Sequence, residues 1–350
     1  MKRLLAFILC FILAVTYVFT LTACNGDKIL VGISMPTDDP GQRWADEGDL
    51  IKKGLEKAGY KVDLKYSDNT FATQMMQIDS MISAGVKAIV LTPVDSNSLK
   101  TVLETAAKAE IFVILHDRIV KDVPYITAYS TYNNVHVGTF QAAYMIAALK
   151  LEESDSVFNM EIFSGPVNDE NAYQIYMGST ALLAQYISGG KLNIVSGDTA
   201  HADTAIAGWS RQGAYERMKQ LLETHYKDKD IHAVLVADDT LAAGVIDALD
   251  EAGKSYPIVI TGHSADASST KNIIAGKQTM SIFKSPVILA DRTVLLVDQI
   301  LSGSEVETTI VTNNGAKEIP TYESPLSIVD IVSYKELLID SGLYSESDFQ

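Results

Sequence analysis

Basic residues are scarce in this chain. There are 28 Lys and Arg against 44 Asp and Glu in 350 residues, which gives a formal net charge of -16. Nucleic acid is therefore not expected as a partner, because binding to phosphates needs a clustered cationic surface. Hydrophobic residues make up 47% and charged residues 21%. With that length and composition, we expect about two folded domains, each with an ordinary hydrophobic core.

Several motifs of enzymes and metalloproteins are also missing. No Gly-x-Gly-x-x-Gly follows the first predicted strand, and there is neither a Gly-Lys-Ser/Thr loop nor a His-Glu-x-x-His. The six histidines, at 116, 136, 201, 225, 232 and 263, have no metal-ligand spacing and are interpreted as structural. The stretch Gly262–Asp266 nearly matches a nucleophile elbow, but its last position would have to be glycine. We therefore predict neither metal, nor cofactor, nor catalysis.

The amino terminus has the organisation of an export signal. Lys2 and Arg3 precede an apolar run from Leu4 to Leu21, and the next residues lead to Cys24. Leu-Thr-Ala-Cys resembles the lipobox of bacterial lipoproteins, which predicts a signal peptide over residues 1–23 and a lipid on Cys24. An uncleaved anchor helix is the alternative. Either way, the remaining chain lies outside the cytoplasmic membrane, and under the lipobox reading it keeps no free thiol.

From Ile29 onward, short β-rich runs alternate with longer amphipathic segments. The first half has predicted strands at 29–34, 61–66, 88–92 and 111–115, with helices near 43–58, 72–83 and 99–109 between them. The second half repeats the pattern, with strands near 158–163, 192–195, 233–237 and 258–261, and helices near 137–149, 172–187, 212–223 and 241–251. A strand at 326–332 and a short helix at 334–341 close the chain. The predicted fold is α/β, with two doubly wound parallel sheets.

Polar side chains gather where the predicted strands end, which is where ligands bind in doubly wound sheets. The only two tryptophans, Trp44 and Trp209, fall at such positions, one in each half. Indole can cover the apolar face of a pyranose, while guanidinium, carboxylate and amide groups can hold its hydroxyls. Taken one by one, these residues could equally pack a core or cap a helix. Taken together, they favour a monosaccharide site.

The residues match a known family at this point. The chain resembles type I periplasmic binding proteins of sugar ABC transporters, in their multiple-monosaccharide and xylose-binding branch. The matching stretches are 31–36 with Arg43-Trp44, 116–119, Asn133-Asn134 with Val137-Gly138, Asn171-Ala172, Trp209, 256–262 and 340–344. Together they extend over essentially the whole chain after residue 24.

The resemblance implies the residues of the site and the lobe boundaries. Ligand-binding residues are then Arg43, Trp44, Asp117, Arg118, Asn134, Asn171, Trp209 and Lys284. The first lobe would hold residues 24–131 and 285–307, and the second 132–284 and 308–350. Three crossings between the lobes, near Ser130, Lys284 and residues 305–325, would form the hinge. The implied partners are a monosaccharide and the permease of an ABC transporter, with the membrane reached through the lipid on Cys24.

Two departures from the family pattern concern carboxylates. Asp238-Asp239 stands where the branch has Asn-Asp, and His263-Ser264 where it has Gln-Asp. We hypothesise that the acceptor has moved from position 264 to Asp238, which adds Asp238 to the predicted site.

Three alternatives to a transport component remain open. The same clamp could report a sugar to a membrane kinase or chemoreceptor, because partner surfaces leave no sequence motif. Arg43 and Arg118 would also suit the carboxylate of a sugar acid. An extracytoplasmic glycoside hydrolase is the weakest of the three, since it would need an acid–base pair of carboxylates.

Overall fold

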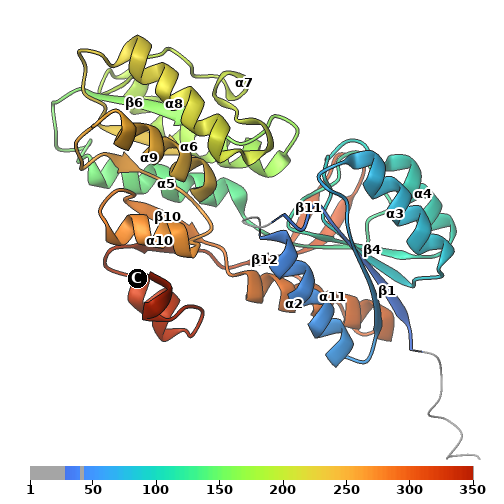
Figure 1. Ribbon diagram of the computed structural model, residues 1–350. Helices are drawn as coiled ribbons and strands as arrows, with labels where there is room; N and C mark the ends of the chain where they lie inside the picture. Colours follow the sequence, from blue (N-terminus) through green and yellow to red (C-terminus); the bar gives the residue numbers. More distant parts are fainter. Residues whose placement is uncertain (1–27, 40–42, 350) are drawn as a thin grey trace, which may run out of the picture.

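The computed structural model describes residues 28–39 and 43–349, which form two α/β lobes side by side (Figure 1). The predicted signal peptide and the lipid site at Cys24 lie outside the described residues. None of the helices in the described part of the chain has the length and hydrophobicity that a membrane-spanning segment needs. The prediction of an α/β fold with two wound sheets is confirmed.

The first lobe is built on a seven-stranded sheet with the order β11-β12-β5-β4-β3-β1-β2. Its strands are β1 (Leu30–Met35), β2 (Lys61–Tyr66), β3 (Ala88–Leu91), β4 (Phe112–His116), β5 (Ala128–Tyr132), β11 (Ile310–Asn313) and β12 (Glu318–Ser324). All neighbours pair in parallel except β11 with β12. The central strands β1, β3 and β4 are mostly apolar and buried, because helices cover both faces of the sheet, whereas the edge strand β2 alternates polar and apolar residues and is half-buried.

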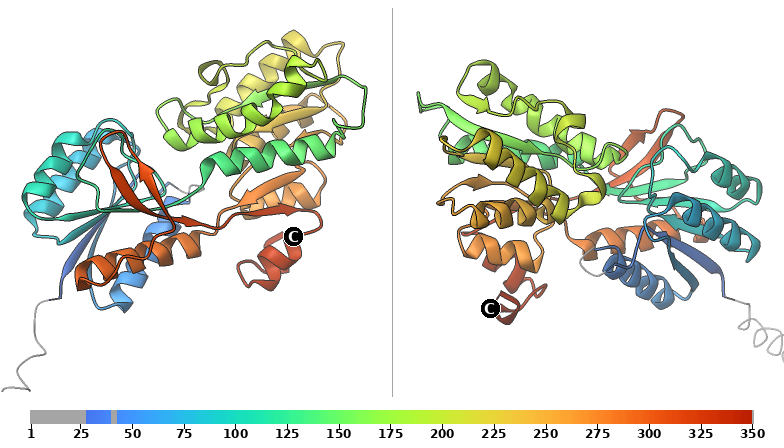
Figure 2. Two further views of the ribbon diagram at one scale, coloured as in Figure 1. Left: turned by 180° about the vertical axis from the view of Figure 1, so that it is seen from behind. Right: turned by 45° about the horizontal axis from the view of Figure 1, so that its top comes forward.

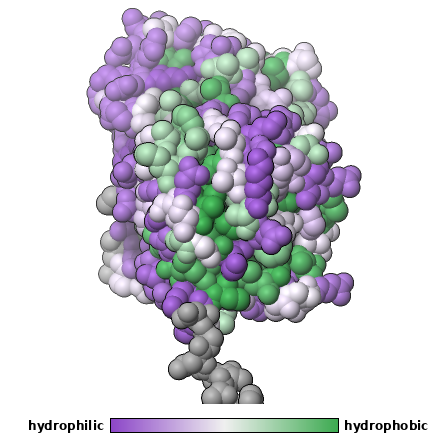
Figure 3. Space-filling model, turned by 90° about the vertical axis from the view of Figure 1, so that its right-hand side faces the viewer, coloured by the Kyte–Doolittle hydropathy of each residue, from purple (hydrophilic) through white to green (hydrophobic). Residues whose placement is uncertain are grey.

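Four helices sandwich this sheet. On one face, α3 (Phe71–Ser83) and α4 (Lys100–Lys108) bury Ile78 and Leu103 in a core with β3 and β4. On the other face, α2 (Trp44–Lys57) and α11 (Pro286–Ser302) bury Ile51 and Leu296 against β1. The winding directs every loop that follows a parallel strand to the same edge of the sheet. In Figure 3 this lobe faces the viewer, with hydrophobic patches lying among hydrophilic surface near the start of the described chain.

The second lobe has a four-stranded parallel sheet and a separate antiparallel ribbon. The sheet order is β7-β6-β8-β9, and the ribbon pairs β10 with β13. The strands are β6 (Phe158–Phe163), β7 (Leu192–Ile194), β8 (Ala233–Val236), β9 (Val259–Ile260), β10 (Met280–Phe283) and β13 (Ser327–Asp330). Helices α5 (Asn134–Ala148) and α6 (Glu170–Ser188) pack on one face of the sheet, and α8 (Arg211–His225) and α9 (Asp239–Glu251) on the other.

Shorter helices complete this lobe. They are α7 (His201–Thr204), the 3-10 turn η1 (Ala207–Trp209), α10 (Ala267–Ile274), and the carboxyl-terminal η2 (Lys335–Asp340) and η3 (Glu346–Phe349). The terminal segment buries Leu338 in a small cluster with Val329 and Ile273. The predicted last strand and closing helix are therefore present, although both are shorter than expected.

The chain crosses between the lobes three times. It leaves β5 for α5 at residues 132–134, returns from β10 to α11 at 284–285, and crosses again from β12 to β13 at 324–327. The predicted assignment of residues 308–350 to the second lobe is wrong for β11 and β12, because β12 pairs with β5 in the first sheet. The crossing predicted within 305–325 accordingly lies at the end of that range. Figure 2 shows the ribbon of β11 and β12 on the first lobe.

Two glycines let α5 and α6 approach closely. A Cβ on Gly138 would lie 2.0 Å from the carbonyl oxygen of Ile175, and a Cβ on Gly178 would lie 2.0 Å from that of Val135. Both obstacles are backbone atoms, which cannot rotate away. The pair of helices that carries Asn134 and Asn171 at its amino ends is thus held together by small residues.

We expect Gly138→Ala to lower the free energy of unfolding by about 1–3 kcal/mol, because the added methyl group must push the two helices apart. Chemical denaturation followed by circular dichroism measures the change. Ala143→Ser, on the exposed side of the same helix, is the control and should stay within about 0.5 kcal/mol of the parent. Equal stabilities of Gly138→Ala and the parent would contradict the close approach.

Candidate functional site

All nine predicted ligand-binding residues lie at helix starts or in loops at the junction of the two lobes. Arg43, Trp44, Asp117 and Arg118 belong to the first lobe, and Asn134, Asn171, Trp209 and Asp238 to the second. Lys284 lies on the crossing between β10 and α11. Their role in binding a ligand stays a prediction, but their contacts show what the site can offer.

The indole ring of Trp44 contacts two cations. It is the first residue of α2 and is only 5% exposed. The guanidinium carbons of Arg43 and Arg118 lie 4.2 and 4.9 Å from its ring centroid. Such cation–π contacts hold both guanidinium groups in place. Arg43 occupies the N-cap position of α2, so the backbone that starts the helix also fixes the origin of its side chain.

Asp117 is the buried carboxylate at the centre of the first-lobe part of the site. It follows β4 with a φ of 62° and accepts a hydrogen bond from Arg43. Burial alone would raise its pKa, but the charges of Arg43 and Lys284 outweigh that effect and hold the pKa of Asp117 well below its usual range. Its Oδ1 atom is buried without a hydrogen-bond partner. An ionised oxygen in this position can accept a hydrogen bond from a ligand hydroxyl.

Three contacts join the two lobes around this carboxylate. Asn171, near the start of α6, donates to the backbone oxygen of Asp117 at 3.3 Å and to its Oδ2 at 3.4 Å. Arg118 forms an ion pair with Asp169 of the second lobe at 2.9 Å. Lys121 and Glu170 form a further pair. All three couple the loop after β4 to the start of α6, so the two lobes contact each other around Asp117.

Trp209 belongs to the second-lobe part of the site. Its indole nitrogen donates to Asp169 at 3.1 Å, and a Cβ on Gly165 would lie 2.3 Å from its ring. The ring also meets His263 edge-on at a centroid distance of 6.0 Å. Trp209 is partly buried against the core of the second lobe. The same ring packs against the core of the second lobe and contacts Asp169 at the junction of the lobes, and its role in binding a ligand stays a prediction.

Asp238 caps the start of α9, where its Oδ1 accepts from the backbone nitrogen of Leu241 at 2.9 Å. Burial raises its pKa to about 7, and the nearby Asp266 adds to this, while Arg43 and Lys284 oppose it. Next to it, Nδ1 of His263 lies 2.6 Å from the carbonyl oxygen of Ala237. Burial holds the pKa of His263 well below its usual range, so this histidine is neutral and donates from Nδ1.

Lys284 lies where the chain crosses the hinge. Its Nζ donates to the amide oxygen of Asn134 at 3.0 Å and lies 5.3 Å from the ring centroid of Tyr132. Burial lowers the pKa of Lys284 to about 8, although the charge of Asp117 opposes the shift. This hydrogen bond joins two of the predicted ligand-binding residues, Lys284 and Asn134.

Several residues of the site were not among the predicted ones. Asp169 accepts from both Arg118 and Trp209, and His263 contacts Trp209. Glu47 and His116, both fully buried, form a 2.7 Å hydrogen bond behind Arg43. Asp169 and His263 lie at strand ends, so their positions were a usable signal. Glu47 carried only its spacing of four residues from Arg43, which is common to many solvated helix faces.

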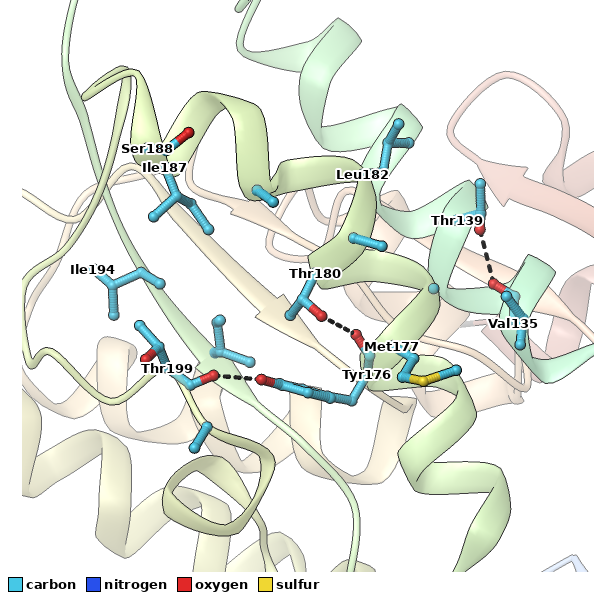
Figure 4. A pocket seen from close by; sticks show the side chains of 15 residues that line it. Val135, Thr139, Tyr176, Met177, Thr180, Leu182, Ile187, Ser188, Ile194 and Thr199 are labelled. Atoms are coloured by element: carbon cyan, nitrogen blue, oxygen red, sulfur yellow. Dashed lines mark hydrogen bonds between the residues drawn. The ribbon is translucent and has the colours of Figure 1, made fainter.

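A large apolar groove lies apart from these residues on the outer side of α6, with a volume of about 1030 Å³. Figure 4 shows it between α6, the start of α5 and the loop after β7. Tyr176 lines the groove, and its hydroxyl donates to the carbonyl oxygen of Thr199 at 2.5 Å. The groove contains none of the nine predicted residues. Within the described ranges, no three His, Cys, Asp or Glu side chains are placed to hold a metal ion.

The raised pKa of Asp238 predicts a pH dependence of stability. The folded protein binds this proton more tightly than the unfolded chain, whose aspartates titrate near ~3.9. The resulting stabilisation is present below about pH 4 and is lost as the pH rises to about 7. Asp238→Asn keeps the helix cap. At pH 8 we expect this variant to unfold at a higher urea concentration than the parent, with a free energy of unfolding that is larger by up to ~4 kcal/mol.

Urea titrations of the ligand-free protein between pH 5 and pH 8 measure this difference. Asp95→Asn is the control, because Asp95 caps a turn of the first lobe by accepting from the backbone of Asn97. It should leave the pH dependence of stability unchanged. The same dependence in the parent and in Asp238→Asn would show that Asp238 does not hold a proton in the folded state.

Comparisons with known proteins identify the family of the chain. The model of the periplasmic binding protein domain matches residues 31–305. The multiple sugar-binding periplasmic protein SbpA of Azospirillum brasilense is 35% identical over 329 residues, which are 93% of this chain and 92% of that protein. The multiple sugar-binding periplasmic receptor ChvE of Rhizobium radiobacter is 36% identical over 333 residues, 93% of this chain and 94% of that protein.

Solved structures give the same result. An ABC transporter solute-binding protein from Clostridium phytofermentans with bound β-D-glucose superposes with a TM-score of 0.89 at 40% identity, covering 92% of this chain and 100% of that one. A carbohydrate transporter solute-binding protein from Chloroflexus aurantiacus, in complex with D-glucose, has a TM-score of 0.83 at 25% identity, with 93% and 99% covered. In fold, length and family match, the chain belongs to the periplasmic binding protein family.

Proposed function

We propose that this protein is the extracytoplasmic sugar-binding component of an ABC transporter, which encloses a monosaccharide between its lobes and delivers it to a permease. The observation that carries the proposal is the buried Oδ1 of Asp117, which has no partner and lies among fixed donors at the junction of the lobes. Relatives whose names state sugar binding support it.

In this proposal, polar residues bind the hydroxyls of the sugar and aromatic residues cover the apolar face of its ring. Asp117, Asn171 and Asn134 offer carboxylate and amide groups, and each can serve a sugar hydroxyl. Trp44 and Trp209 offer flat apolar surface from opposite lobes. The neutral His263 has Nε2 left as an acceptor, because Nδ1 faces the carbonyl oxygen of Ala237. A ligand held in this way touches both lobes at once.

Binding would then favour the closed arrangement. A sugar that contacts both lobes has more contacts in the closed form than in the open form, so it shifts the population towards closure. The ion pair of Arg118 with Asp169 and the hydrogen bonds of Asn171 with Asp117 add cross-lobe contacts that exist only when the lobes meet. The closed surface is what a permease would recognise. A lipid on Cys24 would keep the loaded protein near it.

The charge pairing favours a neutral sugar over a sugar acid. Arg43 already faces Asp117, and Arg118 already faces Asp169. A ligand carboxylate would have to compete with these two side-chain carboxylates for the same guanidinium groups, at a cost in desolvation.

A sensing role, in which the same clamp signals to a membrane kinase or chemoreceptor, would use the same site. Co-purification with a permease or with a kinase separates the two roles.

Calorimetric titration of residues 25–350 with monosaccharides tests the proposal. The panel holds galactose, glucose, xylose, arabinose, ribose, fructose and galacturonate. We expect one or more neutral sugars to bind and to be recovered chemically unchanged, with a change in the fluorescence of Trp44 and Trp209. Binding of galacturonate alone would reassign the site to sugar acids. No binding across the panel, or hydrolysis of a glycoside, would overturn the proposal.

Cys24→Ser tests the anchor. Because a lipid is attached through the cysteine sulfur, the substituted full-length protein should no longer carry the lipid. It should then appear in the soluble fraction of expressing cells or keep its signal peptide uncleaved. Cys10→Ser is the matched control and should leave the protein in the membrane fraction. Immunoblots of fractionated cells, with labelling by a fatty-acid analogue, measure both. Undiminished labelling of Cys24→Ser would contradict a lipid at this position.

A further inference from the structure

We infer that His116 is a positioning residue for ligand binding: as a doubly protonated imidazolium, it holds Glu47 so that Glu47 fixes the guanidinium of Arg43 at the site. The inference rests on the proposed function in one respect, namely that Arg43 contacts the ligand. Its structural part concerns a buried polar network formed by Thr293, His116, Glu47, Arg43 and Asp117.

The network runs continuously from the hinge side to the site. Nδ1 of His116 lies 2.7 Å from the hydroxyl of Thr293 on α11, and Nε2 lies 2.7 Å from Oε2 of Glu47 on α2. The other carboxylate oxygen of Glu47 accepts from Arg43 at 2.8 Å, and Arg43 also donates to Asp117. His116, Glu47 and Thr293 are fully buried. Buried polar groups of this kind need partners, which here come from the network itself.

Counting hydrogens assigns the protonation of Nδ1. The Thr293 hydroxyl has one hydrogen, and we assign it to the hydrogen bond with the carbonyl oxygen of Leu289, which lies 2.9 Å away within α11. Toward His116 it can only accept, so Nδ1 carries a hydrogen. This excludes the neutral tautomer that is protonated on Nε2 alone. Only the hydrogen between Nε2 and Glu47 is left to assign.

The contact of Arg43 with Glu47 decides that assignment. In a buried imidazole–carboxyl pair, a charged donor on the second carboxylate oxygen favours the form in which the proton lies on the ring and the carboxylate is ionised. Glu47 receives such a donor, since the guanidinium of Arg43 binds its Oε1. A charged donor of this kind stabilises the ionised carboxylate. His116 then donates from both nitrogens.

The charges that face this network come from every surrounding element. They are Arg43 at the N-cap of α2, Glu47 of α2, Asp117 and Arg118 after β4, and Lys284 at the crossing before α11, together with the phenol of Tyr132 on β5. Two carboxylates thus meet three cations besides His116. Lys284 is held by Asn134, on the side of the second lobe. The imidazolium adds the positive charge that lets Glu47 remain ionised without drawing Arg43 away from Asp117.

The position of Thr293 gives the network a further consequence. Thr293 lies on α11, the helix that follows the crossing at 284–285. Tyr132 of β5 donates to the backbone oxygen of Ser285 at the start of that helix, at 2.6 Å. The orientation of Arg43 is thereby tied to a hinge helix rather than to α2 alone. A substitution at His116 should loosen Arg43 while the fold of the lobe persists.

The direct test observes the imidazole of His116 in the ligand-free protein. With ¹⁵N-labelled histidine, a spectrum at neutral pH should show one ring with both nitrogens in the protonated range, and this signal should be missing in His116→Gln. A signal for His116 with one unprotonated nitrogen would overturn the inference. Because no sugar is needed, this result stands whether or not the proposed function holds.

The second test measures affinity for whichever panel sugar binds the parent protein. His116→Gln should weaken binding about tenfold, because Glu47 loses a charged donor and Arg43 loses its fixed carboxylate. His225→Gln is the matched control on the exposed end of α8 and should stay within about twofold. If His116→Gln does not fold, Thr293→Val removes the acceptor of Nδ1 and should weaken binding in the same direction. Unchanged affinity in a folded variant overturns the positioning role.

Discussion

The arrangement of this protein depends on burying charge at the junction of its two lobes. Arg43 and Asp117 meet there, with Trp44 against the guanidinium. An unpaired charge in such a place would cost several kcal/mol, so each buried ion must be matched by a partner in a fixed position. The partners come from different elements: α2, the loop after β4, and the hinge. Correct pairing therefore requires the whole first lobe to be folded, and the site is built as a consequence of that packing.

The second lobe completes the site and adds fewer buried ion pairs than the first lobe. It supplies amides from the starts of α5 and α6, and Asp169, which is paired with Arg118. The close approach of α5 and α6 at Gly138 and Gly178 sets the separation of the two amides. The rigid parts of each lobe thus hold half of the donors and acceptors. Under the proposed function, a ligand that contacts both halves would be bound by closing the hinge rather than by reshaping either lobe.

Much of the fold could be predicted from the chain alone. Alternation of apolar β-rich runs with amphipathic segments identified both wound sheets, because the period of burial is a local property. The predicted strand ends identified the loops whose polar residues lie at the junction of the lobes. The segment 310–324 was misplaced, since which sheet a strand joins depends on its pairing partner: β12 pairs with β5, almost two hundred residues away in sequence. A strand's own residues do not record that partner.

The sequence by itself determined the α/β class, the two wound sheets, the scarcity of cysteine, the lack of metal-binding motifs, and the collection of Arg, Asp, Asn and Trp side chains at loop positions. Only the tertiary structure decided which of these side chains are paired, that Oδ1 of Asp117 has no partner, and that His116 lies between Glu47 and Thr293. The physical reason is the distance along the chain over which each kind of interaction acts. Helix and strand periodicity comes from neighbours along the chain, whereas hydrogen bonding and desolvation depend on atoms that folding brings together from distant positions.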